Sequence, residues 1–263
     1  MNQIAAPIKI ALLGPGRVGR PLVAAMQLAG YAVEVFTRGS IDTGKHRNLA
    51  GFQLAFLTLP DQEIPVISGQ IKQFPGEGLI HCSGQVSNRM LGPRSAMFHP
   101  LMSFRGDEEA DVFTGCPIGI SGAGELVNRL QKIADAIGAL PFVLEEEHKA
   151  SYHLAAMFAS VFPYTLLLKA KELAVKSGIA PGQAGRIFGP IFRRALDHLE
   201  QTGAGQGMTG PVSRGDGQTL QEHMTLLADS PEDIALYKAL TRLSIQYANL
   251  EHDIEAKLLG IIE

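Results

Sequence analysis

The chain has 263 residues, 46% of them hydrophobic, a length that suits two compact domains better than one. Lys and Arg total 23 against 26 for Asp and Glu, so the formal net charge is -3 at pH 7. No broad basic surface therefore favours a nucleic-acid or membrane partner. The two cysteines, Cys82 and Cys116, form no CxxC motif, so neither a disulfide framework nor a metal site is expected. Reduced cysteines and first residues without a signal-peptide pattern predict a cytoplasmic protein.

Residues 8–143 alternate short β-rich runs with helical patterns. The runs are IKIALLG (8–14), AVEVF (32–36), QLAFLTLP (53–60), GLIHCSG (78–84), SAMFHPL (95–101), CPIGISG (116–122) and LPFVL (140–144). Alternation of strands with helices is typical of βαβ units, in which helices cover a parallel sheet. The pattern predicts a doubly wound, mainly parallel α/β domain over residues 1–145.

Helical periodicity dominates after the charged segment EEEHKA, so residues 146–263 are predicted to form an all-helical domain. The longest apolar stretch in it is LAAMFASVFPYTLLL, residues 154–168. This stretch is shorter than the roughly 18 to 20 apolar residues of a membrane span, and it contains Pro163 and Tyr164. We therefore expect a buried helix there.

The first β-rich run is followed by GPGRVG, which matches the pattern GxGxxG between a strand and a helix. Gly14 permits a tight turn, Gly16 lets a pyrophosphate approach the backbone, and Gly19 lets the helix pack closely on the sheet. Arg17 and Val18 lie in the first turn of this helix, whose N-terminal N–H groups favour negative charge. The motif predicts a Rossmann domain that binds a dinucleotide. The alternative is a bare strand-to-helix turn.

The second strand indicates which dinucleotide is bound. In NAD-binding domains an acidic residue at the end of this strand binds the ribose hydroxyls. Here Glu34 lies in mid-strand, and the strand ends at Thr37, which is followed by Arg38 and Ser40. A guanidinium and hydroxyl groups bind a 2′-phosphate through charge-assisted hydrogen bonds, whereas a carboxylate repels it. The segment therefore predicts NADP(H), with a solvated Arg38 that has no partner as the alternative.

Three later strands end on the edge where open α/β sheets bind ligands. The candidates for cofactor contact at these ends are Leu59, Pro60 and Ser83. Asp61 is expected to cap the next helix. His99 is expected to line the pocket floor or contact the nicotinamide, with a structural role as the alternative. His81 and Cys82 begin inside their strand and are expected to be structural.

The first helix of the helical half carries Lys149 and His153 at positions i and i+4, so both lie on one face. A reductase needs a group that binds and protonates the substrate oxygen. We expect Lys149 to bind and protonate this oxygen and His153 to orient it. His148 and Tyr152 form a neighbouring pair at the same spacing, so a surface lysine with core histidines is the alternative.

A glycine-rich segment in the helical half, MTGPVSRGDGQT, is the second candidate for part of a site. Arg214 is expected to hold a substrate carboxylate through two hydrogen bonds. Asp216 is expected either to orient that arginine or to cap the following helix. His223 lies two turns further on and is expected to face the same pocket or to pack in the helical domain.

Six motifs carry a resemblance to a known family: GPGRVG, FLTLPD, HCSG, FHPLMSF, KASYHLAAMFAS and TGPVSRGD, in this order. The chain resembles bacterial Rossmann-like proteins with a helical C-terminal domain of unknown function. This group looks like a branch of the 6-phosphogluconate dehydrogenase-like superfamily, alongside ketopantoate reductase, pyrroline-5-carboxylate reductase and deazaflavin-dependent NADP reductases. Two positions depart from the pattern: His153 follows Lys149 where an asparagine is usual, and Val161 replaces a second asparagine.

The resemblance implies an NADPH-dependent reductase of a small oxo-carboxylate, with ketopantoate as the leading substrate. It also implies a homodimer, in which a second copy covers apolar faces within residues 234–262. An imine reductase of the pyrroline-5-carboxylate type is the second interpretation. The third is a protein that binds or senses NADPH without catalysis, which the presence of Lys149 argues against.

Overall fold

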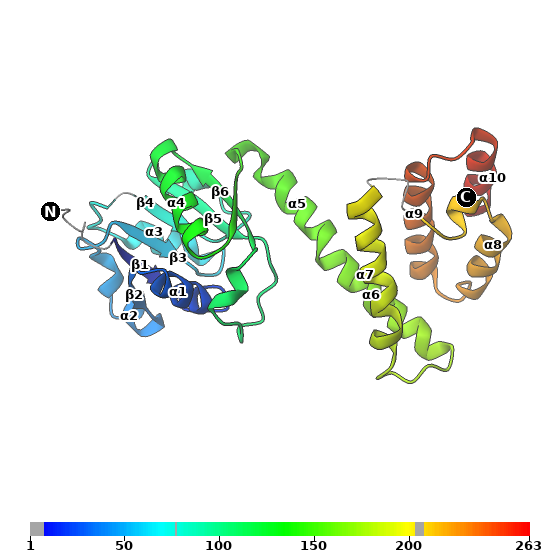
Figure 1. Ribbon diagram of the computed structural model, residues 1–263, viewed down its shortest axis with the longest axis horizontal. Helices are drawn as coiled ribbons and strands as arrows, with labels where there is room; N and C mark the ends of the chain where they lie inside the picture. The colour runs from blue at the N-terminus through cyan, green and yellow to red at the C-terminus, as the bar shows by residue number, and fades with distance from the viewer. Residues whose placement is uncertain (1–7, 77, 203–207) are drawn as a thin grey trace. The chain divides into compact units, whose positions relative to one another are not determined.

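The computed structural model describes residues 8–76, 78–202 and 208–263 (Figure 1). In this part of the chain seven strands form one sheet. They are β1 (Lys9–Leu13), β2 (Ala32–Phe36), β3 (Leu54–Leu57), β4 (Gly78–His81), β5 (Ser95–Pro100), β6 (Pro117–Gly122) and β7 (Leu140–Val143). Each strand falls inside one of the seven runs predicted from the sequence, so the predicted α/β domain is confirmed.

The strands lie in the order β2-β1-β3-β4-β5-β6-β7. Neighbours from β2 to β5 are parallel, β6 is antiparallel to β5, and β7 is parallel to β6. The sheet is therefore mainly parallel, as predicted. After β1 the chain moves outward to β2 and then returns to β3 on the other side of β1. Open α/β sheets bind ligands at the carboxyl ends of the strands where the order reverses in this way, here β1 and β3.

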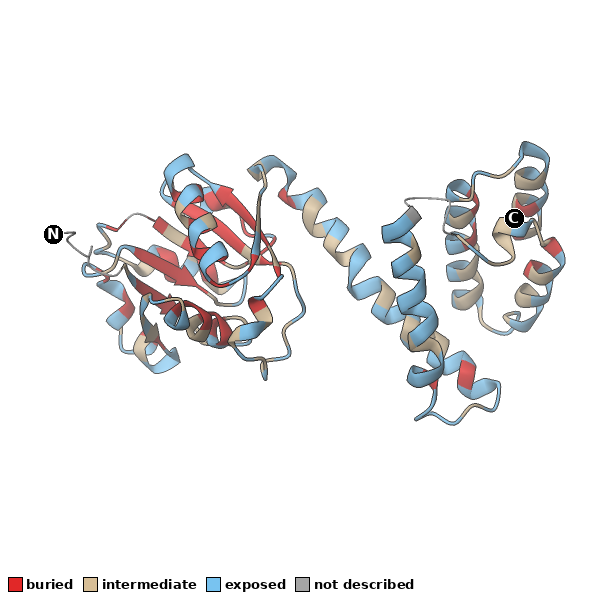
Figure 2. Ribbon diagram, viewed as in Figure 1, coloured by how far each residue is buried: buried red, intermediate tan, exposed pale blue. Residues whose placement is uncertain are grey.

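The sheet is buried on both of its faces. The elements around it are α1 (Gly19–Leu28), α2 (Arg38–Asp42), η1 (Lys45–Arg47), α3 (Glu63–Gln70), η2 (Asn88–Met90), η3 (Ala110–Phe113) and α4 (Gly124–Ala136). In β1, Ile10 and Leu12 pack in one core cluster with α1 and α4, and Ala11 and Leu13 pack in another with α3. Burial on both faces explains why the strands are continuous apolar runs. Figure 2 shows the buried residues concentrated in this unit.

The second half of the chain is helical, as predicted. Its elements are η4 (Glu146–His148), α5 (Lys149–Ala159), α6 (Val161–Lys176), α7 (Ala184–Thr202), η5 (Val212–Arg214), α8 (Gly217–Leu226), α9 (Pro231–Tyr247) and α10 (His252–Ile262). The chain divides into two compact units, Met1–Pro163 and Tyr164–Glu263. α5 belongs to the first unit, so this division lies later than the boundary between residues 145 and 146, where the sheet ends and the helices begin.

The boundary between the two units along the chain falls near a break between helices α5 and α6. α5 ends at Ala159, and Pro163 lies in the first turn of α6. A proline lacks the N–H that would bond to the carbonyl four residues earlier, which here is that of Ala159. In the second unit, the buried residues Leu220, Ile245 and Leu258 hold α8, α9 and α10 together.

The apolar stretch 154–168 is not the buried helix expected from the sequence. It spans the end of α5 and the start of α6, and most of its side chains are exposed, with Phe158 at 58% and Tyr164 at 66%. The expectation was wrong because most of this apolar surface is left uncovered within the described residues. Within the described residues, Glu146–Lys176 is the one helical stretch long and apolar enough to cross a membrane, with mean hydropathy 1.3. An exposed apolar surface of this kind marks a site of interaction with a partner or a membrane.

Candidate active site

The turn between β1 and α1 has the shape that the glycine motif predicts. Gly14 has φ +90°, a left-handed conformation that favours glycine, and a Cβ there would lie 2.6 Å from Leu59 Cδ2. A Cβ on Gly19 would lie 2.5 Å from Thr58 Oγ1, so glycine allows α1 to pack against the end of β3. Thr58 Oγ1 donates to the carbonyl of Gly14 at 2.6 Å. These contacts hold the turn at the carboxyl ends of β1 and β3.

Gly16 differs from the other two motif glycines because the protein's own packing does not require it. A Cβ there would have the carbonyl oxygen of Gly14, at 3.9 Å, as its nearest neighbour, and the residue is exposed. α1 has no acidic residue in its first turn, and its N-cap residue, Val18, makes no side-chain cap hydrogen bond. The N-terminal N–H groups of α1 therefore face an open approach that fits a pyrophosphate. Arg17 is exposed in the same turn and adds positive charge.

Arg38 begins α2 directly after β2, between the exposed Thr37 and the half-buried Ser40. Its Nη1 donates to Glu63 Oε2 at 2.9 Å, and its Nε lies 3.7 Å from Asp42 Oδ1. The alternative of a solvated arginine without a partner is therefore wrong. The side chain is 70% exposed, and an exposed ion pair is weak enough for a bound phosphate to compete for the guanidinium.

Asp61 follows Pro60 at the end of β3 but does not cap α3. The N-cap residue is Gln62, and its backbone is already helical, with φ -69° and ψ -22°, so the expected capping role of Asp61 is wrong. The carboxylate of Asp61 acts on other groups at this edge of the sheet. Burial lowers the pKa of both Lys149 and His99, and the charge of Asp61 opposes both shifts.

The loop after β4 is shaped by Ser83. Its Oγ accepts hydrogen bonds from the backbone N–H groups of Gln85 at 3.1 Å and Val86 at 3.0 Å. The residue is buried, and its contact with the cofactor stays a prediction. Cys82, just before it, packs against the core of the sheet, as its expected structural role requires.

Lys149 is buried, with 4% of its surface exposed. Its Nζ donates to the carbonyl of Val86 in the loop after β4 and lies 3.7 Å from Glu146 Oε2. The alternative of a surface lysine is therefore wrong. Burial lowers the pKa of Lys149, and the charge of Glu146 opposes this shift. An amine with a lowered pKa releases its proton more readily than a free lysine, as a proton donor requires.

Glu146 connects Lys149 to a buried polar network. Glu146 Oε1 accepts from the backbone N–H of Asn88 at 2.9 Å. The side-chain amide of Asn88 donates to Ser121 Oγ at 2.9 Å, and its Oδ1 lies 2.8 Å from His81 Nε2. Burial, and then the charge of Lys149, lower the pKa of His81 to about 4, so this imidazole is neutral at pH 7. His81 is therefore a structural residue, as expected.

Two further imidazoles line a cavity of about 370 Å³ beside the end of β5. His99 Nδ1 lies 2.8 Å from Tyr152 Oη, and His153 Nδ1 lies 3.4 Å from Gln85 Nε2. A Cβ on Gly84 would come within 3.1 Å of both imidazoles, so glycine at this position lets both rings pack close to the loop after β4. The remaining walls come from residues 101–103 and the last turns of α5. Neither lysine nor arginine is among the described residues that line it.

The predicted site residues of the first unit therefore form two groups. His99 and His153 face one cavity, and Lys149 lies beneath the adjoining loop that contains Ser83. The glycine turn and Arg38 lie at the carboxyl ends of β1 and β2.

The predicted residues of the second unit lie around the start of α8. Arg214 is exposed at the end of η5. Asp216 caps α8, since its Oδ1 accepts from the backbone N–H of Thr219 at 3.1 Å. Its alternative role of orienting Arg214 stays a prediction. His223 Nδ1 lies 2.9 Å from Tyr237 Oη on α9, which is the packing role given as one alternative.

Sequence reasoning missed Glu146, Asn88 and Gln85 as parts of the site. All three either lie in the loop after β4 or contact it. This loop connects β4 to β5 with only the short helix η2, so no periodic sequence pattern indicated these residues. A signal for Tyr152 was present, because it lies one residue before His153 at the start of an apolar helix.

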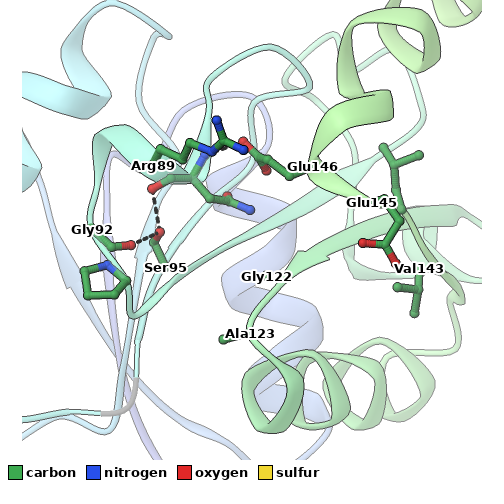
Figure 3. A pocket seen from close by; sticks show the side chains of 11 residues that line it. Arg89, Gly92, Ser95, Gly122, Ala123, Val143, Glu145 and Glu146 are labelled. Atoms are coloured by element: carbon green, nitrogen blue, oxygen red, sulfur yellow. Dashed lines mark hydrogen bonds between the residues drawn. The ribbon is translucent and has the colours of Figure 1, made fainter.

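A larger cavity, about 490 Å³, lies where β5 begins and where β6 and β7 end. Figure 3 shows Arg89 beside Glu146, with Glu145 on the side of β7 and Ser95 below. Ser95 Oγ donates to the carbonyl of Gly92 at 2.6 Å. This cavity lies at the end of β5 opposite to His99, away from the carboxyl ends of the parallel strands. We therefore place the candidate active site at the smaller cavity.

Comparisons with known proteins agree with this fold. Residues 116–244 match the family described as "Domain of unknown function (DUF2520)". A comparison with curated protein sequences gives no match. The chain is similar to a candidate NADP oxidoreductase from Bacteroides fragilis, at 22% identity and a TM-score of 0.73, over 91% of this chain and 98% of that one. A protein from Thermotoga maritima matches at 22% identity and a TM-score of 0.74, over 91% of this chain and 98% of that one.

An imine reductase from Myxococcus stipitatus, solved with NADP+, matches at 15% identity and a TM-score of 0.63, over 95% of this chain and 99% of that one. Other structures of this fold hold NAD+ or NADPH. The chain therefore has the Rossmann fold of NAD(P)-binding oxidoreductases, and the DUF2520 match includes most of its helical part.

Proposed function

We propose that this protein is an NADPH-dependent reductase of a small oxo-carboxylate, with ketopantoate as the leading substrate. The observation that carries the proposal is the open approach above Gly16, where the protein's own packing leaves room for a pyrophosphate. This approach lies at the sheet edge where Rossmann oxidoreductases bind their cofactor. Arg38 at the end of β2 supports NADPH over NADH, because its guanidinium matches a 2′-phosphate.

The chain's own residues supply binding and proton transfer in this proposal. A bound NADPH provides the hydride for the substrate carbon. Lys149, with its pKa lowered by burial, supplies the proton for the substrate oxygen. His153 orients the substrate at the wall of the cavity. A separate proposal for the second unit is that the exposed Arg214 binds a substrate carboxylate.

The test is the loss of NADPH absorbance when the purified protein is mixed with 2-oxo acids and cyclic imines. We expect turnover of ketopantoate with NADPH and slower turnover with NADH. Tight NADPH binding without turnover of either substrate class would contradict the proposal and favour the non-catalytic NADPH-binding protein.

Imine reduction of the pyrroline-5-carboxylate type is the second candidate. The cavity beside His99 has neither lysine nor arginine among the described residues that line it, and a protonated imine needs no such positive charge at its nitrogen. The likeness to imine reductases supports the same candidate at the level of fold. Turnover of pyrroline-5-carboxylate but not of ketopantoate would favour it.

We further propose that the protein is a homodimer. Leu236, Leu240, Leu243 and Tyr247 lie at helical spacing on α9, and each is between 38% and 57% exposed. An apolar stripe of this kind is stabilised by contact with a second copy. Sedimentation should give a dimer, and Leu240→Lys should shift it toward monomer, whereas Leu226→Lys on α8 should not. A monomeric wild-type protein that floats with lipid vesicles would show that a membrane is the partner instead.

A further inference from the structure

His99 and Tyr152 form a pair that no role assigned above explains. His99 lies on β5 and Tyr152 on α5, and His99 Nδ1 is 2.8 Å from Tyr152 Oη. The two rings are nearly perpendicular, at 88°, with centroids 5.6 Å apart. The phenol is also held by its neighbours. Phe142 packs edge-on against its ring, and a Cβ on Gly119 would lie 3.2 Å from its oxygen.

The direction of this hydrogen bond follows from the chemistry of the two groups. A phenol is a better donor than acceptor, and His99 Nδ1 is the partner that the described residues offer to the Tyr152 hydroxyl. Tyr152 therefore donates, and Nδ1 accepts with its lone pair. A neutral imidazole has one proton on its two nitrogens, so the proton of His99 is on Nε2.

The surroundings keep both groups in these protonation states. Burial, together with the charges of His153 and Lys149 and against that of Asp61, lowers the pKa of His99 to about 4. Burial raises the pKa of Tyr152 to about 12. Between these values the pair holds one phenol proton and one imidazole proton.

The ring of His99 lies close to Gly84 and lines the cavity of about 370 Å³. A Cβ on Gly84 would lie 3.2 Å from His99 Nε2 and 3.1 Å from His153 Cδ2. Glycine at position 84 therefore lets both imidazoles pack close to the backbone of this loop, beside the cavity that both line. Because Tyr152 occupies Nδ1, Nε2 is the ring nitrogen that His99 can offer to an acceptor atom in that cavity.

We propose that Tyr152 is a positioning residue that holds His99 in the Nε2–H tautomer, so that the site presents a fixed, neutral hydrogen-bond donor to a carbonyl oxygen. This inference rests on the proposed function and narrows its substrate class. A carbonyl oxygen accepts a hydrogen bond from Nε2–H, whereas a protonated imine nitrogen has no lone pair to do so. The pair therefore selects oxo compounds over protonated imines, with His99 binding the substrate oxygen.

The experiment that tests the inference measures the tautomer directly. Protein containing ¹⁵N-labelled histidine is studied by NMR at pH 7, without cofactor or substrate. The signals of His99 are assigned by their loss in His99→Gln, since the chain has 8 histidines. We expect an unprotonated Nδ1 and a protonated Nε2 in the wild-type protein, and a mixture of both tautomers in Tyr152→Phe. A wild-type His99 with its proton on Nδ1, or a Tyr152→Phe variant with the wild-type pattern, would overturn the inference.

Kinetics add a second readout. In Tyr152→Phe, turnover of the oxo substrate should fall by about tenfold or more, the effect of one misplaced hydrogen bond in a transition state, with the affinity for NADPH unchanged. Equal turnover in the two proteins would count against the inference. If Tyr152→Phe does not fold, the wild-type NMR spectrum alone tests the tautomer of His99. The spectrum needs no turnover, so a protein that reduces nothing contradicts the proposed function and leaves the tautomer measurable.

Discussion

Glu146 Oε2 lies 3.7 Å from the Nζ of Lys149, one helical turn further along the chain. The carboxylate is also fixed from the other side, by the backbone N–H of Asn88. Lys149 Nζ in turn donates to the carbonyl of Val86. The amine is therefore held in one place by groups of the loop after β4, rather than swinging freely on its four-carbon chain. Such restraint is what a proton donor of fixed geometry requires.

Replacing Lys149 by methionine tests this role. Lys149→Met keeps an unbranched apolar chain in the buried space and removes the proton donor, so turnover should fall by about a hundredfold or more. The affinity for NADPH should change little, because the glycine turn that binds it is separate. Lys176→Met is the matched control, since that lysine is exposed and forms its ion pair with Glu172 on the same helix. Stopped-flow reduction rates near the wild-type value in Lys149→Met would refute the role.

Arg38 and Glu63 offer a test of cofactor choice. The guanidinium that matches a 2′-phosphate already donates to Glu63 Oε2 at 2.9 Å. Arg38→Ala should weaken NADPH binding by about ten- to a hundredfold and leave NADH binding nearly unchanged. Glu63→Gln should strengthen NADPH binding, because the arginine loses a competing carboxylate. Fluorescence titration with NADPH and with NADH measures both affinities in each variant. Equal losses for NADPH and NADH in Arg38→Ala would show that Arg38 does not bind the extra phosphate.

Alanine substitutions at the glycines of the first turn test NADPH binding and the stability of the fold separately. Gly16→Ala places its Cβ in open space, so the thermal midpoint should stay the same while NADPH affinity falls by about tenfold or more. Gly19→Ala should instead destabilise the fold, since its Cβ would lie 2.5 Å from Thr58 Oγ1. Gly51→Ala, exposed with open space around it, should change neither quantity. Calorimetry with and without NADPH measures both, and unchanged affinity in Gly16→Ala would contradict the pyrophosphate site.

The sequence was sufficient for features that depend on local pattern. The strands are buried on both faces and therefore appear as apolar runs, and the glycine motif prescribes a turn whose geometry is almost fixed. The placement of Lys149 and His153 on one face of α5 follows from helical spacing alone.

Features that depend on long-range contacts were not predictable. Asp61 was expected to cap α3, but the helical turn begins one residue later and frees its carboxylate. The network through Glu146 and Asn88 depends on the path of the loop after β4, which leaves no periodic signal. The exposed apolar stretch 154–168 was misjudged because hydrophobicity predicts that a surface is covered and does not say by what.

His81 makes the stability of the first unit depend on pH. Its imidazole is fully buried, its Nε2 contacts Asn88, and its pKa is lowered from 6.5 to about 4 by burial and by the charge of Lys149. The unfolded chain therefore binds one more proton than the folded chain between these two pH values, so the free energy of unfolding falls as the pH drops through this range. The loss should reach about 3 kcal/mol near pH 4, at about 1.4 kcal/mol for each pH unit.

Urea unfolding followed by circular dichroism at pH 7, 6, 5 and 4 measures this dependence, since the chain has no tryptophan to report by fluorescence. His81→Gln keeps a hydrogen-bond donor for Asn88 but does not titrate, so its free energy of unfolding should start lower and fall less steeply than that of the wild type. His148→Gln, at a side chain that is 63% exposed, should keep the wild-type slope. If His81→Gln also keeps that slope, the acid sensitivity arises elsewhere, and the neutral state assigned to the buried imidazole is wrong.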